Sequence, residues 1–382
     1  MLLIYVFMLP DQSHLFDVPD GVTYLNSAYF GPRLHSVAKA AAESVALTGR
    51  PWEVGPAMFF EPVERLRGLV ASAMNGDSDG VALIPGISYG AGVAAANLSV
   101  GAGRTIVVVD EQFPSNVYPW RTKVAVDGGE VITVKRTPDG WTHGILNAID
   151  DRTAVVAVPN CHWTDGSLVD LVAVGRAARS VGAALAIDAS QSFGAMPLDV
   201  DRIQPDFVYS VGYKWQLGFY GLAYLWVAEG HRLGTPLEEG WATRKDAEDF
   251  AGLVDYTDVY EPGARRFDTG ERSNFIGVAM SLAAMEQINA WGVSNVAESL
   301  ASVTDAIAEG AAERGWIAAS KEHRAPHLIG IRRPEGLPTG IAGKLAAASV
   351  SVSVRGDSIR IAPHLHTTGG DIDHLLSVLE SR

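Results

Sequence analysis

Short apolar runs alternate with helical patterns through the middle of the chain. Each run is uninterrupted by charge and is followed by a stretch that favours a helix, such as residues 168–181. This alternation is typical of a parallel α/β sheet whose helices cover its two faces. The pattern predicts seven strands, at residues 81–84, 105–109, 131–134, 154–158, 183–187, 207–209 and 223–227.

A different pattern follows the predicted sheet. Residues 275–291 are apolar nearly all round and predict a buried helix, and a further helix at about residues 294–314 leads into a second unit. There the sequence predicts strands at 327–332, 350–355 and 358–362 and a last helix at 370–379.

The fold class that we predict is therefore α/β, with a large, mainly parallel seven-stranded sheet domain and a small α+β C-terminal domain. The expected division is an N-terminal segment (1–20) that packs on the small domain, a large domain (21–292) and a small domain (293–382). The segment 241–266 has no clean period and is predicted to be an excursion near the active site that shapes specificity.

Composition narrows the classes of function. The 382 residues are 47% hydrophobic and 19% charged, which is globular composition and large enough for a two-domain enzyme. A formal charge of −14 argues against nucleic acid or an anionic membrane as partner. The single cysteine, Cys161, excludes an intramolecular disulfide and a cysteine metal cluster, and no metal site is expected. We expect a cytoplasmic protein.

Residues 1–7 are apolar but too short to span a bilayer, and we hypothesise that translation begins at Met8.

One lysine and one aspartate carry the main chemical signal. Asp188 follows the strand at 183–187, and Lys214 lies shortly after the strand at 207–209. Each alone has a common structural explanation, a helix cap for the aspartate and a solvated surface for the lysine. Together they lie at one edge of a parallel sheet. Pyridoxal phosphate (PLP) needs this pair, an amine for its aldehyde and an acid that keeps its ring nitrogen protonated.

The run Asp188-Ala189-Ser190-Gln191-Ser192, followed by Gly212-Tyr213-Lys214-Trp215, resembles the class V aminotransferase family of fold-type I PLP-dependent enzymes. This family includes cysteine desulfurases, selenocysteine lyases, kynureninases and isopenicillin N epimerase. The resemblance implies that Lys214 forms the Schiff base with the cofactor, that Asp188 partners the pyridinium nitrogen, and that Gln191 hydrogen-bonds the phenolic oxygen of the ring.

The phosphate of the cofactor is expected where a Gly-rich loop opens a helix. Residues 85–90 follow a strand and contain Ser88 and Tyr89, and backbone N–H groups at such a helix start favour a dianion. In the resembled family this position binds the phosphate, and Tyr213 often adds its hydroxyl. Phe113 is expected to stack on the pyridine ring, although a core phenylalanine is the alternative.

Substrate contacts are expected from other segments of the chain. Arg360 lies inside an apolar run, where an unpaired guanidinium is costly, so it needs an anion. The resemblance implies that Arg360, and with less support Arg355, binds the substrate α-carboxylate. Asn26 and Tyr29 resemble a substrate-side loop. Residues 160–166 end the strand at 154–158 and are expected to line the same cleft, where His162 is either a substrate contact or a hydrogen-bonded structural histidine.

The segment 266–274 resembles the part of the family that reaches the phosphate of a neighbouring subunit. Gly270, Ser273 and Asn274 are the expected contacts, which implies a homodimer with shared active sites. The alternative is that Arg265, Arg266 and Arg272 form only local salt bridges.

The reaction itself stays open at this point. Lys214, once displaced by the substrate amine, can remove the Cα proton, and transamination, loss of a β-substituent or epimerisation can follow. Residues 350–358 hold no cysteine, so a persulfide-forming desulfurase is disfavoured. We favour a lyase that cleaves a β-substituent, often through a C–S bond, from an amino acid. An aminotransferase or epimerase and a non-catalytic scaffold are the alternatives.

Overall fold

The computed structural model describes residues 9–380, so the hypothesis about Met8 lies outside the described residues. Its centre is a seven-stranded sheet with the order β2-β8-β7-β6-β5-β3-β4. All seven predicted strands are present. The sheet is parallel apart from β8, which runs antiparallel to both β2 and β7. The strands are β2 (Val81–Ile84), β3 (Thr105–Val109), β4 (Glu130–Val134), β5 (Thr153–Pro159), β6 (Ala184–Asp188), β7 (Phe207–Val211) and β8 (Ala223–Val227).

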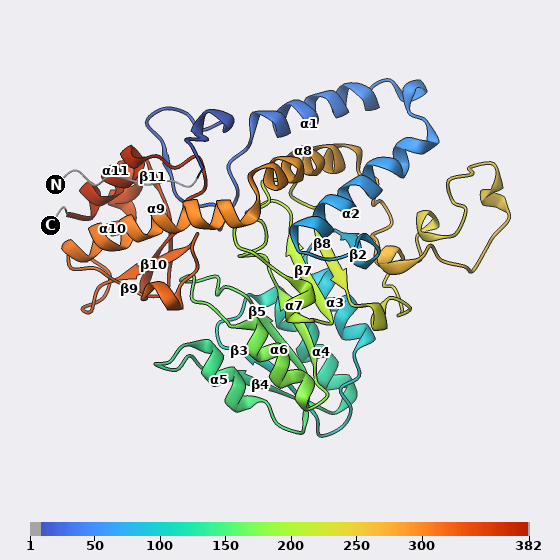
Figure 1. Ribbon diagram of the computed structural model, residues 1–382, viewed down its shortest axis with the longest axis horizontal. Coiled ribbons are helices and arrows are strands. Elements are labelled where there is room, and N and C mark those ends of the chain that lie inside the picture. The colour runs from blue at the N-terminus through green and yellow to red at the C-terminus, as the bar shows by residue number, and fades with distance from the viewer. Residues whose placement is uncertain (1–8, 381–382) are drawn as a thin grey trace.

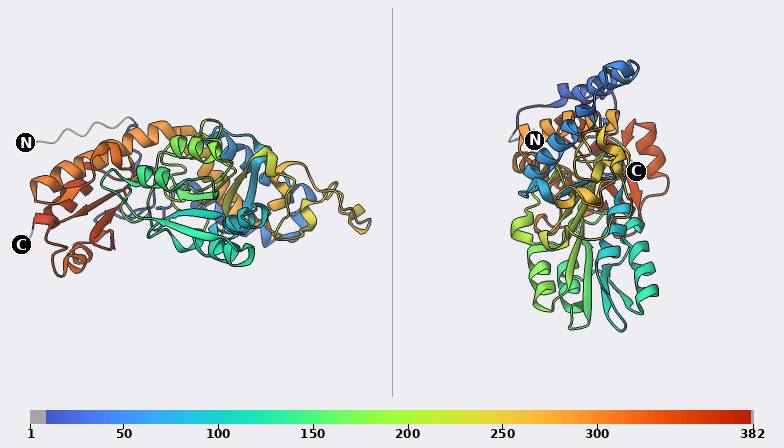
Figure 2. Two further views of the ribbon diagram at one scale, coloured as in Figure 1. Left: turned by 90° about the horizontal axis from the view of Figure 1, so that it is seen from below. Right: turned by 90° about the vertical axis from the view of Figure 1, so that its right-hand side faces the viewer.

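Helices cover both faces of this sheet (Figures 1 and 2), which explains why its strands are almost uniformly apolar. On one face α3 (Ile87–Asn97) and α4 (Tyr118–Asp127) pack on alternate strand residues. The other face is covered by α2 (Glu61–Ala73), α5 (Trp141–Ala148), α6 (Leu171–Ser180) and the short α7 (Val200–Ile203).

Two further long helices connect the sheet to the C-terminal unit. The predicted buried helix is α8 (Phe275–Trp291), which packs against α1 (His35–Thr48) and α2. The next helix, α9 (Val293–Glu313), extends into the C-terminal unit (Figure 1).

The C-terminal unit is α+β, as predicted. Its four-stranded antiparallel sheet has the order β12-β13-β10-β9. The predicted single strand at 350–355 is wrong, because the chain there divides into two short strands with different partners. β11 pairs in parallel with β1, whereas β12 pairs with β13. The elements are β1 (Thr23–Tyr24), β9 (Ile317–Ala318), β10 (Ile329–Arg332), α10 (Ile341–Ala347), β11 (Val350–Ser351), β12 (Ser353–Arg355), β13 (Ser358–Ile361) and α11 (Gly369–Glu380).

The N-terminal segment lies against the start of α9 and the end of α8. The backbone N–H of Leu9 donates to Ser299 Oγ at 3.0 Å, and Trp291 Nε1 donates to Gln12 Oε1 at 2.9 Å. The domain boundaries themselves stay a prediction. No helix within residues 9–380 has the length and apolarity needed to cross a membrane.

Candidate active site

Lys214 lies in a tight turn directly after β7. The turn contacts the loop that contains Gly31, because the N–H of Gly31 donates to the Tyr213 carbonyl at 2.9 Å. A Cβ at position 31 would lie 2.1 Å from the Lys214 carbonyl oxygen, so only glycine permits this approach. The loop thereby buries the lysine to 7% exposure.

Asp188 ends β6, the strand next to β7, and both side chains line one cavity. Asp188 Oδ1 accepts the N–H of Ser190 at 3.0 Å. Lys214 Nζ has no hydrogen-bond partner among residues 9–380; it lies 5.5 Å from the ring centroid of Phe113 and 5.8 Å from that of Tyr213. The expected juxtaposition of amine, carboxylate and aromatic rings is therefore present.

Burial dominates the electrostatics of this pair. It lowers the pKa of Lys214 to about 8, with Arg360 and Arg355 adding to the effect and Asp188 opposing it. Burial also raises the pKa of Asp188, against the hydrogen bonds from Ser190 and the charge of Lys214. A buried lysine with a lowered pKa is a competent nucleophile and base near neutral pH.

Gln191 lines the same cavity, but its amide is already partly engaged. Its Oε1 accepts from Trp215 Nε1 at 3.0 Å, and its Nε2 donates to the Ala28 carbonyl at 3.1 Å. An amide nitrogen carries two N–H groups, so one remains for a ligand oxygen. The predicted contact with the phenolic oxygen thus requires the nitrogen of Gln191.

Aromatic side chains form another part of the wall of the Lys214 cavity. Phe113 lines the cavity and is 39% exposed, so it is not the core phenylalanine that was the alternative. Its ring meets Trp163 edge-on at 5.7 Å between centroids. Trp163 also lines the cavity and is fixed by an indole hydrogen bond to the Glu111 carbonyl at 2.7 Å.

Arg360 is buried at 1% exposure, as its apolar surroundings in the sequence implied. Its Nη1 donates to the Trp163 carbonyl at 2.8 Å and its Nη2 to Ser353 Oγ at 3.4 Å, while Nε has no partner. Within residues 9–380 it forms no ion pair. Burial and the charge of Arg355 lower the pKa of Arg360 to about 10. The guanidinium thus lacks the anion that its burial requires.

The predicted phosphate end is the start of α3. Ser88 is exposed in its first turn and Tyr89 is half-buried. The hydroxyl of Tyr89 is buried without a hydrogen-bond partner, and burial raises its pKa. An orphaned buried hydroxyl beside a helix N-terminus fits an anionic oxygen.

His162 does not line the cavity. Its ring nitrogens lie 2.7 Å from Thr164 Oγ1 and 3.2 Å from the Asp110 carbonyl, and its ring stacks on Trp141 at 4.8 Å. A substrate contact from His162 is therefore not supported, and the alternative of a structural histidine fits. Its neighbour Trp163 takes the position on the cavity wall.

Asn26 and Tyr29, the two residues predicted to form a substrate-side loop, have different surroundings. Asn26 Oδ1 accepts from Ser353 Oγ at 2.9 Å, which ties the loop to the strand beside Arg360. Tyr29, at 63% exposure, is free to contact a ligand.

Gly270, Ser273 and Asn274 all have partners within the chain. The N–H of Gly270 donates to Glu238 Oε2 at 2.6 Å, and the hydroxyl of Ser273 to the Phe59 carbonyl at 2.7 Å. Asn274 caps α8 by accepting the N–H of Gly277 at 2.8 Å. Their contact with a second subunit stays a prediction.

The arginines of this segment do form local ion pairs, which was the alternative for them. Arg272 pairs with the buried Asp268 at 2.8 Å, and Arg265 pairs with Glu64 at 2.7 Å. Arg266 instead lies over the Tyr260 ring, 4.4 Å from its centroid.

Residues 160–166, which end β5, were expected to line this cleft, and Cys161 and Trp163 of that segment do line the cavity. Ser353, which contacts Arg360, was not identified from the sequence, because nothing in its residue type distinguishes it.

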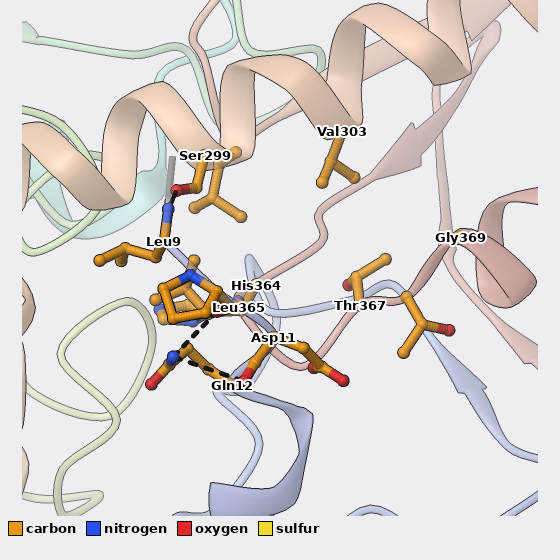
Figure 3. Close-up of a pocket in the computed structure, with 12 residues that line it drawn as sticks. Leu9, Asp11, Gln12, Ser299, Val303, His364, Leu365, Thr367 and Gly369 are labelled. Atoms are coloured by element: carbon orange, nitrogen blue, oxygen red, sulfur yellow. Dashed lines mark hydrogen bonds between the residues drawn. The ribbon is translucent and has the colours of Figure 1, made fainter. Parts of the chain in front are cut away.

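A second cavity lies between the N-terminal segment, α9 and the start of α11 (Figure 3). Asp11 and His364 are its titratable groups. His364 Nδ1 already accepts the N–H of Leu365, and burial lowers its pKa. This cavity therefore does not compete with the Lys214 cavity as the site of the chemistry.

The fold and the paired lysine and aspartate define a class of protein, the fold-type I PLP-dependent enzymes. The chain matches the Aminotransferase class-V family over residues 41–368 and belongs to that family. The resemblance read from the motifs is confirmed, and with it the expectation of a PLP-dependent enzyme.

Relatives and structural neighbours agree with this assignment. An uncharacterized aminotransferase, YcbU of Bacillus subtilis (strain 168), is 27% identical, and the match covers 98% of each chain. A probable cysteine desulfurase of Methanothermobacter thermautotrophicus is 30% identical over 69% of this chain and 67% of its own length. The solved structure of a C-DES mutant with glycine covalently linked to the PLP cofactor superposes with a TM-score of 0.84. It is 20% identical and covers 97% of this chain and 99% of its own, so it supports the fold.

Proposed function

We propose that the protein is a PLP-dependent lyase that removes a β-substituent, typically through a C–S bond, from an α-amino acid. The observation that carries this proposal is the buried amine of Lys214, which shares a cavity with Asp188 while Arg360 is buried nearby without an ion-pair partner. A cytoplasmic setting belongs to this proposal, because a chain with one cysteine forms no intramolecular disulfide.

The residues present fit PLP. Lys214 would hold its aldehyde carbon, Asp188 its ring nitrogen and Phe113 its ring face. Ser88, Tyr89 and the start of α3 would hold its phosphate, with Tyr213 beside them. When bound, PLP supplies an aldehyde that links to amines and a ring that accepts the electron pair of the Cα–H bond.

Lys214 and Arg360 would have separate roles toward the substrate. The guanidinium would hold the α-carboxylate by the charge-assisted hydrogen bonds that it lacks in its present surroundings. That contact orients the Cα–H bond toward the lysine amine. With a pKa of about 8, Lys214 can take up the Cα proton and return it near neutral pH.

The properties of the single cysteine favour a lyase over a persulfide-forming desulfurase. Cys161 is the chain's one cysteine, and it is 1% exposed. Burial raises the pKa of its thiol, which disfavours the thiolate needed to accept sulfur. The sulfur fragment would therefore leave as a free product.

An aminotransferase is the second candidate, because the relative that spans the whole chain is named as one. The two reactions differ in product. A lyase converts a β-substituted amino acid and water into pyruvate, ammonium and the released substituent. An aminotransferase passes the amino group to a keto acid and releases no substituent.

The test incubates the PLP-loaded protein with L-cysteine, L-cystine and L-alanine. We expect pyruvate from the sulfur amino acids and a visible absorption band that borohydride abolishes. Lys214→Ala should lose both, whereas Lys123→Ala, which removes a partly buried lysine of α4 paired with Asp127 at 3.2 Å, should keep them. L-alanine carries no β-leaving group, so pyruvate formed from it only when a keto acid is added, with none from the sulfur amino acids, would favour the aminotransferase. A colourless protein that takes up no PLP would favour a non-catalytic scaffold.

A further inference from the structure

One face of the β12–β13 hairpin carries two arginines. Ser353 pairs with Arg360 and Arg355 with Ser358 across the two strands. Side chains of paired residues, and of residues two apart, lie on the same face of a sheet. The opposite face belongs to the core of the C-terminal unit through Ile359 and Ile361. The hairpin therefore presents two guanidinium groups on one side.

Arg355 lies at the aromatic wall of the active-site cavity. Its guanidinium carbon is 5.6 Å from the ring centroid of Trp163, the residue that lines the cavity and accepts from Arg360. Its charge also contributes to lowering the pKa of both Lys214 and Arg360. Arg355 is thus an electrostatic part of the site.

Arg355 has unused hydrogen-bonding capacity. Its Nη1 donates to the carbonyl of Val354 at 2.8 Å, but its Nε is buried with no partner. Within residues 9–380 it forms no ion pair. The adjacent Asp357 lies 3.7 Å from Arg332, and Asp165 in the loop after β5 is paired with Arg136.

The charges around the cavity do not balance. Lys214, Arg360 and Arg355 are cationic groups, and Asp188 is the carboxylate that lines the cavity. One α-carboxylate on Arg360 leaves Arg355 uncompensated. The two arginines branch from backbone positions about 7 Å apart along the strand direction, which suits two separate anionic groups better than the two oxygens of one carboxylate.

We infer that Arg355 is a specificity-determining residue that binds a second anionic group on the side chain of the substrate. The substrate class is then an α-amino acid whose β-substituent carries a carboxylate or an acidic sulfur group. This inference rests on the proposed function, because it takes Arg360 as the site of the α-carboxylate.

Binding of L-aspartate and L-asparagine to the PLP-loaded protein tests the inference, because these amino acids are nearly isosteric and differ in charge. Dissociation constants are measured by titration calorimetry, with the cofactor absorbance as a second readout. We expect wild-type protein to bind aspartate about 10- to 100-fold more tightly than asparagine, as a charge-assisted hydrogen bond would give.

Arg355→Gln should abolish this preference, so that the two dissociation constants become nearly equal, whereas Arg355→Lys should retain part of it. The matched control is Arg333→Gln, because Arg333 lies over Trp316 at 4.9 Å and near Glu335 at 3.4 Å in the same unit. This control should keep the wild-type preference.

Equal affinity of wild-type protein for the two amino acids would overturn the inference, as would a preference that survives in Arg355→Gln. If Arg355→Gln does not fold, the wild-type and Arg355→Lys measurements still decide it. Failure of the proposed function has a different signature, no response to any amino acid, and it would remove this inference as well.

Discussion

At the scale of single residues, the site is a set of polar groups whose burial is only partly compensated. Within residues 9–380 the amine of Lys214 has no hydrogen bond, Arg360 has no ion pair and the hydroxyl of Tyr89 has no partner. Such groups cost free energy in the folded protein, and a ligand that supplies the missing partners would offset that cost.

The pKa of Lys214 predicts how cofactor uptake depends on pH. The amine must be unprotonated to attack an aldehyde, and its folded-state pKa is lowered to about 8. The rate at which cofactor-free protein takes up PLP should therefore rise with pH and level off above about 8. Stopped-flow absorbance measures this rate.

Asp188→Asn tests the direction of this pH dependence, because the Asp188 charge raises the pKa of Lys214. Removing that charge should move the rise in rate to lower pH. Asp206→Asn, just before the other end of β7, should leave the profile unchanged. A rate that does not vary across neutral pH would contradict the prediction.

Arg360→Met should separate function from stability. Loss of a charge-assisted contact to the substrate should lower kcat/KM by about 10- to 100-fold, mainly through KM. Because an uncompensated buried charge is removed, the free energy of unfolding should change by no more than about 1 kcal/mol. Steady-state kinetics and urea unfolding test this, and a large loss of stability would show that Arg360 is instead a structural residue.

At the scale of elements, the sequence predicted what local pattern determines. The strands of the large sheet are apolar runs, and α8 is apolar nearly all round, so their positions followed directly. The division of residues 350–355 between β11 and β12 did not, because β11 pairs with β1 more than three hundred residues away. Gln191 was placed correctly in the cavity, but its bond to Trp215 depends on a turn that no pattern encodes.

Asn274 combines two roles that one pair of substitutions can separate. It caps α8, and the family resemblance also places it near the phosphate of a neighbouring subunit. Asn274→Ala should cost about 1 kcal/mol of folding stability through the lost cap. Asn274→Asp keeps an acceptor at the cap and should keep stability, but its charge should weaken PLP binding if it lies near the phosphate.

Thermal unfolding and PLP titration measure the two effects independently. Asp170→Ala is the matched control, because Asp170 caps α6 with its side chain accepting from Val172 and Ala173 at 3.0 Å. It should lose stability alone. Unchanged PLP affinity in Asn274→Asp would argue that Asn274 is only a cap.

At the scale of the whole molecule, a large exposed apolar set lies outside the active site. Trp52 is 79% exposed, Leu233 83%, Val254 76% and Tyr256 96%. The last two belong to the excursion 241–266, which projects from the body at the end opposite the C-terminal unit (Figure 1). The excursion contributes no residue to the cavity around Lys214. The family resemblance implies a second copy of the chain as partner, and the excursion, with Val254 and Tyr256 exposed on it, is a candidate surface for that contact.

If the protein is a homodimer with shared active sites, mixing two defective variants in one dimer should restore activity. Lys214→Ala subunits lack the lysine but have an intact Asn274, and Asn274→Asp subunits have the reverse. If segment 270–274 serves the neighbouring site, each mixed dimer contains one site with both native residues. At a PLP concentration too low to load Asn274→Asp alone, random mixing of the two variants should then restore about a quarter of wild-type activity, since half of the dimers are mixed and each has one working site. Mixing Lys214→Ala with Asp188→Asn is the control, because both residues line the same cavity and no site regains both. Absence of recovery in the first mixture, with dimers present by sedimentation, would mean that each subunit carries its site alone.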